Sequence, residues 1–186
     1  MSKLKILVCN NYSDAFQTII QKENYIDVSI LPYPCICEDK KNMALSACLL
    51  EDTLKNTDDL VIVCSSYCDI LKAIPPDKPI KTLKTNHCFN HLVNEGFANY
   101  IIEKGGYIVS NGWLANWETQ IEKQGFDREM AQDYYKSFCK ELVCFDLGKN
   151  TQTEFLMAEL SDYLGLSYTI IEADLDKVNN ITWLLV

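Results

Sequence analysis

An uninterrupted apolar run, Leu60-Val61-Ile62-Val63-Cys64, is typical of a strand that is buried on both faces of a parallel sheet. Weaker strand signals are spaced along the rest of the chain, at residues 3–9, 25–31, 80–84, 107–110, 142–147 and 167–171. Most of them alternate with stretches of helical periodicity. This alternation predicts one three-layer, doubly wound α/β domain over residues 1–186, built on a mostly parallel sheet of six or seven strands.

Capping and breaking signals set the expected ends of the helices. Helices are expected from residue 13 or 14 to 22 and at 38–56, 89–104, 114–124, 127–140 and 151–164. Asp127 is a good N-cap, and Gly105 and Gly165 each follow a helix, where glycine is common. Pro32 and Pro34 are expected to stop the second strand. Residues 174–186 give no clear signal.

Composition and charge exclude some classes of partner. The chain has 186 residues, enough for one sizeable core, and a net charge of −9. Electrostatic binding to nucleic acid or to an anionic membrane needs a basic patch, and the densest basic pair is Lys40-Lys41. No apolar stretch reaches the roughly 18 residues that span a bilayer, and no signal-peptide pattern precedes the first strand. We therefore expect a cytoplasmic protein that binds neither nucleic acid nor membrane.

Nine cysteines are many for a cytoplasmic protein. Their odd number and strand-like surroundings argue against a disulfide framework, which is typical of short secreted chains. Free cysteine is among the most frequently buried residue types, so core packing explains most of them simply. On this ground we assign four to the core: Cys48, Cys64, Cys139 and Cys144.

Three other cysteines, Cys9, Cys68 and Cys88, stand at or just beyond the ends of expected strands. If these strands are parallel neighbours, the thiols meet at the carboxyl edge of the sheet, where open α/β folds bind ligands. Cys35 and Cys37 are further candidates. Thiolates suit iron–sulfur clusters and zinc, and three of them leave one coordination position open. We expect a metal centre, with an iron–sulfur cluster preferred over zinc; scattered buried cysteines fit the spacing equally well.

Two more features are candidates for the surrounding pocket. His87 and His91 flank Cys88, and a neutral imidazole can supply a fourth ligand or orient a thiolate. Trp113 and Trp117 are expected on one helical face, where they would form an apolar wall for a ligand. A solvated position is the alternative for the histidines, and core packing is the alternative for the tryptophans. We assign His91, Trp113 and Trp117 to the cofactor pocket.

Several stretches carry a family resemblance: Asn86-His87-Cys88-Phe89, Tyr107-Ile108-Val109-Ser110-Asn111-Gly112-Trp113-Leu114-Ala115-Asn116-Trp117, Gly125-Phe126-Asp127-Arg128 and Leu142-Val143-Cys144-Phe145-Asp146-Leu147-Gly148, with looser matches at Val8-Cys9 and Ser66-Tyr67-Cys68. In them the chain resembles an uncharacterised α/β domain family of anaerobic bacteria and methanogenic archaea. Its members occur alone near corrinoid methyl-transfer systems or as N-terminal domains of sensor kinases. The resemblance implies a sensing domain with Cys9, Cys68 and Cys88 as its ligand-binding residues.

These observations predict a domain that senses redox state or a small molecule at a metal centre and reports to a signalling effector or a second copy. No nucleophile elbow, HExxH motif or carboxylate pair indicates a reaction. Two alternatives stay open. One is an enzyme or accessory protein of corrinoid-dependent methyl-group metabolism, with a corrinoid as cofactor. The other is an interaction module without a cofactor.

Overall fold

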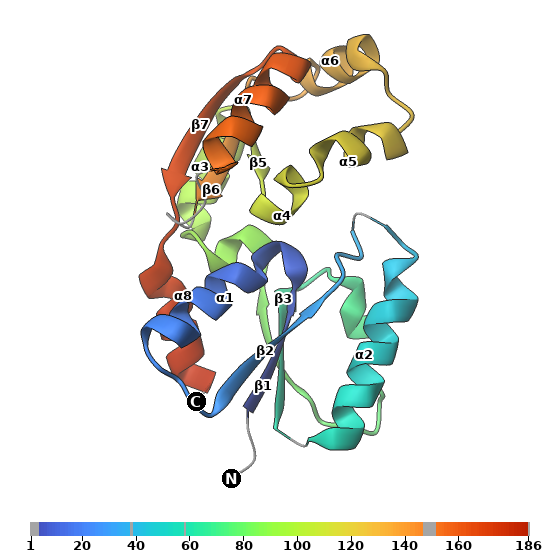
Figure 1. Cartoon of the computed structure of the whole chain (residues 1–186), viewed down its shortest axis with the longest axis vertical. Coiled ribbons are helices and arrows are strands. Elements are labelled where there is room, and N and C mark those ends of the chain that lie inside the picture. Colours follow the sequence, from blue (N-terminus) through green and yellow to red (C-terminus); the bar gives the residue numbers. More distant parts are fainter. Residues whose placement is uncertain (1–3, 38, 58, 147–151, 186) are drawn as a thin grey trace. The chain divides into compact units, whose positions relative to one another are not determined.

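The computed structural model describes residues 4–37, 39–57, 59–146 and 152–185 (Figure 1). In these residues seven strands form two parallel sheets, one of four strands and one of three. The chain divides into two compact units: Met1–His91 with Leu175–Val186, called the first unit, and Leu92–Asp174, called the inserted unit. The α/β class and the parallel strands predicted from the sequence are confirmed, but the strands form two sheets rather than one.

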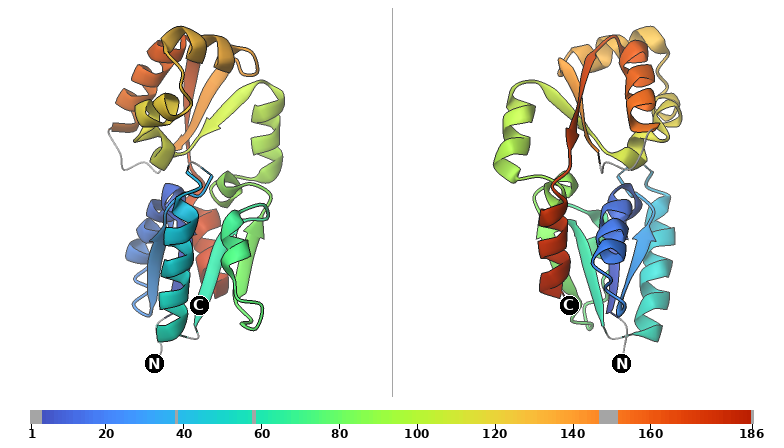
Figure 2. Two further views of the ribbon diagram at one scale, coloured as in Figure 1. Left: turned by 90° about the vertical axis from the view of Figure 1, so that its right-hand side faces the viewer. Right: turned by 60° about the vertical axis from the view of Figure 1, so that its left-hand side comes forward.

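The first unit is built on the four-stranded sheet, in the order β2-β1-β3-β4. Its strands are β1 (Leu4–Cys9), β2 (Val28–Tyr33), β3 (Leu60–Ser65) and β4 (Lys81–Thr85). Its helices are α1 (Asn10–Lys22), α2 (Asn42–Asn56) and α8 (Leu175–Leu185), with the 3₁₀ helices η1 (Asp69–Ala73) and η2 (Cys88–His91). Helices α1 and α8 cover one face of the sheet and α2 covers the other (Figures 1 and 2).

Strand β3 lies inside the sheet, and each of its residues is buried. Ile62 pairs in register with Leu7 of β1 and with Thr82 of β4. Ile62 and Leu7 have no exposed surface. This is the arrangement that the unbroken apolar run predicted, because a strand covered by helices on both faces has no solvent side to leave polar.

The edge strand β2 differs from the sequence-based expectation. Pro32 was expected to stop it, but the strand continues to Tyr33. Pro32 pairs with Val8 of β1, on the only side of β2 that has a neighbouring strand. Proline lacks the N–H that a second neighbour would need, so an edge strand is where it is tolerated.

The inserted unit is built on the three-stranded sheet, in the order β5-β6-β7. Its strands are β5 (Gly106–Val109), β6 (Glu141–Asp146) and β7 (Ser167–Glu172). Its helices are α3 (Glu95–Glu103), α4 (Asn111–Leu114), α5 (Trp117–Lys123), α6 (Arg128–Lys136) and α7 (Gln152–Leu164). Helix α3 covers one face of this sheet, and α6 and α7 lie on the other (Figure 2). The chain enters and leaves side by side, because Asp174 N donates to Leu92 O at 2.9 Å.

Local signals placed most helix ends of this unit correctly. The Asp127 side chain accepts a hydrogen bond from Met130 N at 2.9 Å and begins α6. Gly105 follows α3 with φ +90°, and Gly165 follows α7 with φ +64°, the left-handed conformation that favours glycine. The helix expected at 89–104 is instead η2 followed by α3, which Asn94 caps. The expected strand end at residue 147 and helix start at 151 lie outside the described residues.

The sequence pattern could not predict that the strands divide into two sheets. Among the described strands, β4 pairs only with β3 and forms one edge of the first sheet, whereas β5 pairs with β6. Apolar character and period indicate that a segment is a strand, but they do not specify which strand donates to its backbone carbonyls. The order of strands is a property of the tertiary structure, so the single sheet of the sequence-based prediction is corrected here.

Candidate functional site

The carboxyl edge of the first sheet gathers the cysteines singled out in the sequence. Cys9 ends β1 and pairs in register with Tyr33, the last residue of β2. Cys68 and Cys88 follow the ends of β3 and β4, at the start of η1 and in η2. The two loops are joined, because Ser66 N donates to Thr85 O at 2.7 Å. Parallel strands bring these ends to one edge, which is where such folds place ligands.

Tyr33 lies at the centre of this cluster and was not singled out in the sequence. Its hydroxyl oxygen is 3.4 Å from Cys68 Sγ, and its side chain has no exposed surface. Burial raises the pKa of Tyr33 far above its ordinary value, and negative charge on Cys68, Cys9 or Cys64 would raise it further. The phenol therefore stays protonated and is able to donate a hydrogen bond to Cys68. No signal in the sequence pointed to Tyr33, because Pro32 was expected to stop the strand before it.

Cys64 and Cys88 extend the cluster on the side of β3 and β4. Burial raises the pKa of the Cys64 thiol to about 12, and negative charge on Cys68 or Cys88 adds to this. Burial also raises the pKa of Cys88, although a hydrogen bond with Ser65 opposes the shift. Of the four cysteines assigned to the core from the sequence, Cys64, Cys139 and Cys144 are buried, whereas Cys48 on α2 is exposed and that assignment is corrected. Cys64 lies in the core but also belongs to the thiol cluster.

Cys35 and Cys37 lie in the loop that follows β2. A hydrogen bond with Cys35 raises the pKa of the Cys37 thiol, and nearby negative charge on Cys35 and Asp69 acts in the same direction. Cys35 is buried and Cys37 is exposed. Asn42 Nδ2 donates to Cys35 O at 2.8 Å, which ties this loop to the start of α2. Negative charge on Cys37 also raises the pKa of Cys88, so the pair adjoins the other thiols.

Burial is the main influence on the electrostatics of this edge, and repulsion between neighbouring thiolates adds to it. Each thiolate would raise the pKa of its neighbours, and burial removes the water that would screen the charge. A bound soft cation offsets this effect, and the thiol donor set has the chemistry that such a cation prefers. Among the described residues, however, no group of three or more His, Cys, Asp or Glu side chains is arranged to hold a metal ion.

His91 lies near the same edge, buried beneath the ends of β3 and β4. Its Nε2 is 3.3 Å from Thr85 Oγ1, and its ring meets that of Phe16 edge-on at 6.2 Å. Burial lowers the pKa of His91 to about 4, although a hydrogen bond with the Cys64 backbone opposes the shift. The ring is therefore neutral at physiological pH. Within the described part of the chain, His91 Nδ1 and Asn90 Nδ2 are buried without a hydrogen-bond partner.

Trp113 and Trp117 belong to the inserted unit and not to the unit that holds the thiols. The single helix expected from 114 to 124 is broken, because α4 ends at Leu114 and α5 begins at Trp117. Trp117 is buried, and its ring centroid lies 5.1 Å from that of Tyr163. Trp113 is partly buried against the same hydrophobic core. Both residues thus pack as the core alternative predicted, and their role at a cofactor stays a prediction.

The comparisons with known proteins add no family. No protein-family model matches the chain, and a search of curated proteins finds no similar sequence. The resemblance stated from the sequence therefore stays a prediction.

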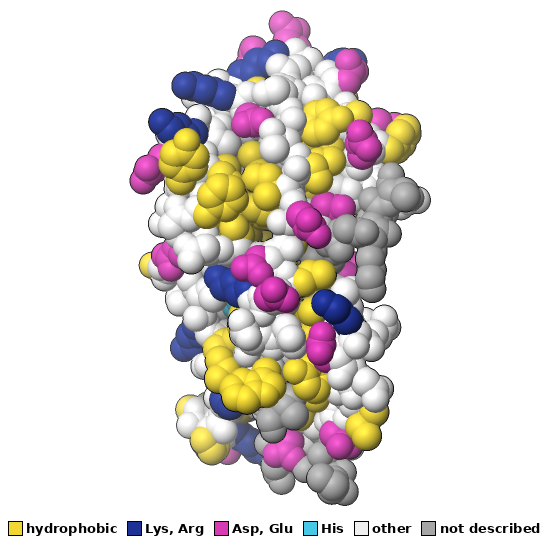
Figure 3. Space-filling view, turned by 90° about the vertical axis from the view of Figure 1, so that its left-hand side faces the viewer, with side chains coloured by type: hydrophobic (Ala, Val, Ile, Leu, Met, Phe, Trp, Pro, Cys, Tyr) yellow, Lys and Arg dark blue, Asp and Glu magenta, His cyan; other side chains and the backbone are white. Residues whose placement is uncertain are grey.

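The length of the helices and the side chains at the surface can be compared with the partners expected from the sequence. None of the described helices is both long and apolar enough to cross a membrane. On the face of the molecule seen in Figure 3, basic side chains are scattered among acidic ones. Hydrophobic side chains also reach the surface, and Trp183 and Leu184 on α8 are among the most exposed large hydrophobic side chains of the described residues.

Proposed function

We propose that the first unit is a cytoplasmic sensing domain whose thiol cluster binds a soft metal centre, preferably an iron–sulfur cluster. One observation supports this proposal above the others. Cys9, Cys68 and Cys88 come from three separate segments of the sequence and follow the ends of strands at one edge of one parallel sheet, where Tyr33 lies beside Cys9 and Cys68. Cys64, Cys35 and Cys37 adjoin them and supply further sulfur donors.

The buried thiols and Tyr33 would each have a role in binding the metal centre at this edge of the sheet. Cys64 and Cys88, whose pKa values burial raises, stay protonated until a cation favours the thiolate, so binding releases protons there. Tyr33 would then donate its hydroxyl hydrogen to the Cys68 thiolate and fix the direction of that sulfur. The bound centre itself would supply a redox change or an open coordination position.

A change in the charge of the metal centre would alter the conformation of the loops that carry its cysteine ligands. Cys68 immediately precedes η1, and Cys88 begins η2, so both short helices are attached to ligand positions. The exposed Trp183 and Leu184 of α8 offer an apolar surface for a signalling effector or a second copy of the chain. The domain would thereby report the state of the centre to its partner.

The test is the metal content of protein purified without oxygen. Iron, zinc and acid-labile sulfide are measured together with the visible absorption spectrum. We expect iron and sulfide in the wild type and their loss in Cys9→Ser, Cys68→Ser and Cys88→Ser. Cys139→Ser is the matched control, since Cys139 is buried but belongs to the inserted unit. Tyr33→Phe keeps every thiol and should retain the metal.

Other results lead to different conclusions. Wild-type metal content in all three cysteine variants would refute the site, as would a wild type without metal and with nine titratable thiols. Zinc without sulfide would mean that the centre is a structural or Lewis-acid zinc site and not an iron–sulfur cluster. A tightly bound corrinoid would favour the alternative in methyl-group metabolism. Circular dichroism on each variant separates loss of the metal from loss of the fold.

A further inference from the structure

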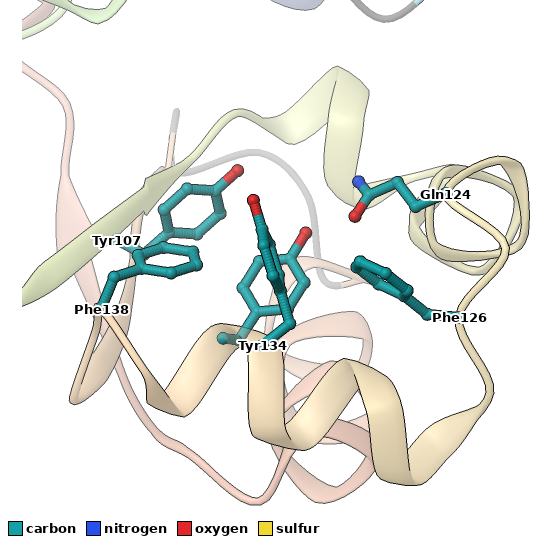
Figure 4. Close-up of a pocket in the computed structure, with 6 residues that line it drawn as sticks. Tyr107, Gln124, Phe126, Tyr134 and Phe138 are labelled. Carbon is teal, nitrogen blue, oxygen red and sulfur yellow. The ribbon is translucent and has the colours of Figure 1, made fainter.

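The inserted unit contains a cavity of about 590 Å³ that is remote in sequence from every cysteine of the thiol cluster. Its volume lies within the roughly 300 to 1,000 Å³ that is usual for small-molecule sites. The strand β5, the end of α5, the loop after it and helix α6 supply the lining. The lining residues are Tyr107, Gln124, Phe126, Tyr134, Tyr135 and Phe138 (Figure 4).

Aromatic rings form the walls of this cavity and hold one another in place. The Tyr134 ring centroid is 5.0 Å from that of Phe126 and 5.2 Å from that of Phe138. Tyr107 meets Phe138 edge-on at 5.8 Å and Tyr135 edge-on at 5.5 Å. Packed aromatic pairs of this kind restrict ring rotation, so the walls are largely formed before a ligand arrives.

A turn brings polar and aromatic lining residues together on the side of α5. Gly125 stands between Gln124 and Phe126 with φ +75°. A Cβ atom added at Gly125 would meet nothing within 4 Å, so the backbone conformation, and not the space, is what favours glycine there. The turn lets Gln124 and Phe126 both line the cavity.

Polar groups with spare hydrogen-bonding capacity point into the same space. In Figure 4 the hydroxyl groups of Tyr107 and Tyr134 and the carboxamide of Gln124 converge, with Phe126 and Phe138 on either side. The Tyr135 hydroxyl shares hydrogen bonds with Gln124 and Tyr107. A phenol can make three hydrogen bonds and a carboxamide four, so these contacts leave donors and acceptors for a ligand.

The charge of the lining narrows the class of ligand. None of the six described residues that line the cavity carries a charge. A charged ligand would lose water here without gaining an opposite charge. A flat neutral ring, in contrast, can stack on the aromatic walls while its polar edge meets the carboxamide and the phenols.

We propose that this cavity binds an uncharged, planar heteroaromatic compound, with Tyr134 as the stacking residue and Gln124 as the hydrogen-bonding residue. Both side chains are accessible, since Tyr134 is 49% exposed and Gln124 lies at the surface. Substitutions at these two positions therefore leave the core of the inserted unit intact. This proposal is independent of the metal site in the first unit.

The test uses nicotinamide and adenine as probes, with the whole protein and with protein-observed NMR titration. We expect saturable shifts at the tyrosine and Gln124 signals below about 10 mM, a weak but specific affinity. Cyclohexanecarboxamide is the matched probe, because it keeps the amide of nicotinamide and lacks the planar ring. Tyr134→Leu and Gln124→Leu should each weaken nicotinamide binding about tenfold. Phe155→Leu should not, since Phe155 is an exposed aromatic residue of the same unit outside the cavity.

Each other outcome overturns the proposal. Absence of shifts with both aromatic probes would show that the cavity does not bind this class of compound. Equal affinity for cyclohexanecarboxamide would mean that planarity plays no part. Binding of tetramethylammonium in preference to nicotinamide would identify an aromatic cage for cations instead. Unchanged affinity in Tyr134→Leu, with a folded protein by circular dichroism, would place the binding elsewhere.

Discussion

Lowering the pH from 7 to 5.5 should reduce the free energy of unfolding by about 1 kcal/mol through His91 alone. Its side chain is 1% exposed, and burial lowers its pKa to about 4, from an ordinary value of 6.5. In the unfolded chain the imidazole takes up a proton as the pH falls through 6.5. In the folded protein it stays neutral until about pH 4. Stability is therefore complete above pH 6.5 and is lost as the pH falls toward 4.

The full size of the effect follows from the difference between the two pKa values. A difference of 6.5 − 4 in pKa corresponds to about 3 kcal/mol, and this full loss is reached only when the pH falls below both values. The groups around the His91 ring are consistent with a lowered pKa. Phe16 and Thr85 offer no negative charge, and the positive charge of Lys177 disfavours a second cation.

The assay compares urea unfolding at pH 7 and pH 5.5 for the wild type and for His91→Gln. The variant should lose most of the pH dependence, whatever its stability at pH 7. His87→Gln is the control, because His87 is exposed and is the only other histidine. With two histidines, the NMR signals of the ring protons can also be titrated separately. A His91 ring that titrates near 6.5 in the folded protein, or an equal pH dependence in His91→Gln, would refute the reasoning.

Three other predictions concern stability and can be checked by urea unfolding. Tyr33→Phe should cost about 1 to 2 kcal/mol, because it removes the buried contact with Cys68; no change would mean that the two groups form no hydrogen bond. Ile62→Ala should cost about 2 to 5 kcal/mol through a core cavity, whereas Ile26→Ala, at a side chain 73% exposed, should be nearly neutral. Asp127→Ala should cost about 1 kcal/mol and Asp127→Asn much less, since asparagine retains an oxygen for Met130 N; an equal cost for both would exclude capping as the cause.

The parts of the fold that were predictable from the sequence depend on neighbouring residues. The apolar run of β3, the N-cap of α6 at Asp127 and the glycine after α7 are each fixed within a few residues. The edge position of the thiols was also accessible, because parallel strands end on the same side of a sheet. Those inferences needed no knowledge of which strand pairs with which.

The remaining features depend on contacts between distant segments. Tyr33 reaches Cys68 across the sheet edge, and its role was invisible without the pairing of β1 with β2. The tryptophans were assigned to the pocket because they share a helical face, and their place in the inserted unit follows from strand pairing that helical spacing does not reveal. Strand pairing is selected by the packing of the whole chain, which short-range periodicity does not encode.

The first unit is built from two segments that are separated in the sequence by the whole inserted unit. This arrangement has a consequence for synthesis of the protein. Helix α8 packs against α1, and Tyr25 Oη donates to Asn179 Oδ1 at 3.1 Å, so the cover of α1 comes from a segment 154 residues further along the chain. The whole inserted unit, which is continuous in sequence, is synthesised between these two segments. Until α8 has been synthesised, the apolar face of α1 stays exposed to solvent, and exposed apolar surface favours aggregation. Chaperone binding during translation would act on this face.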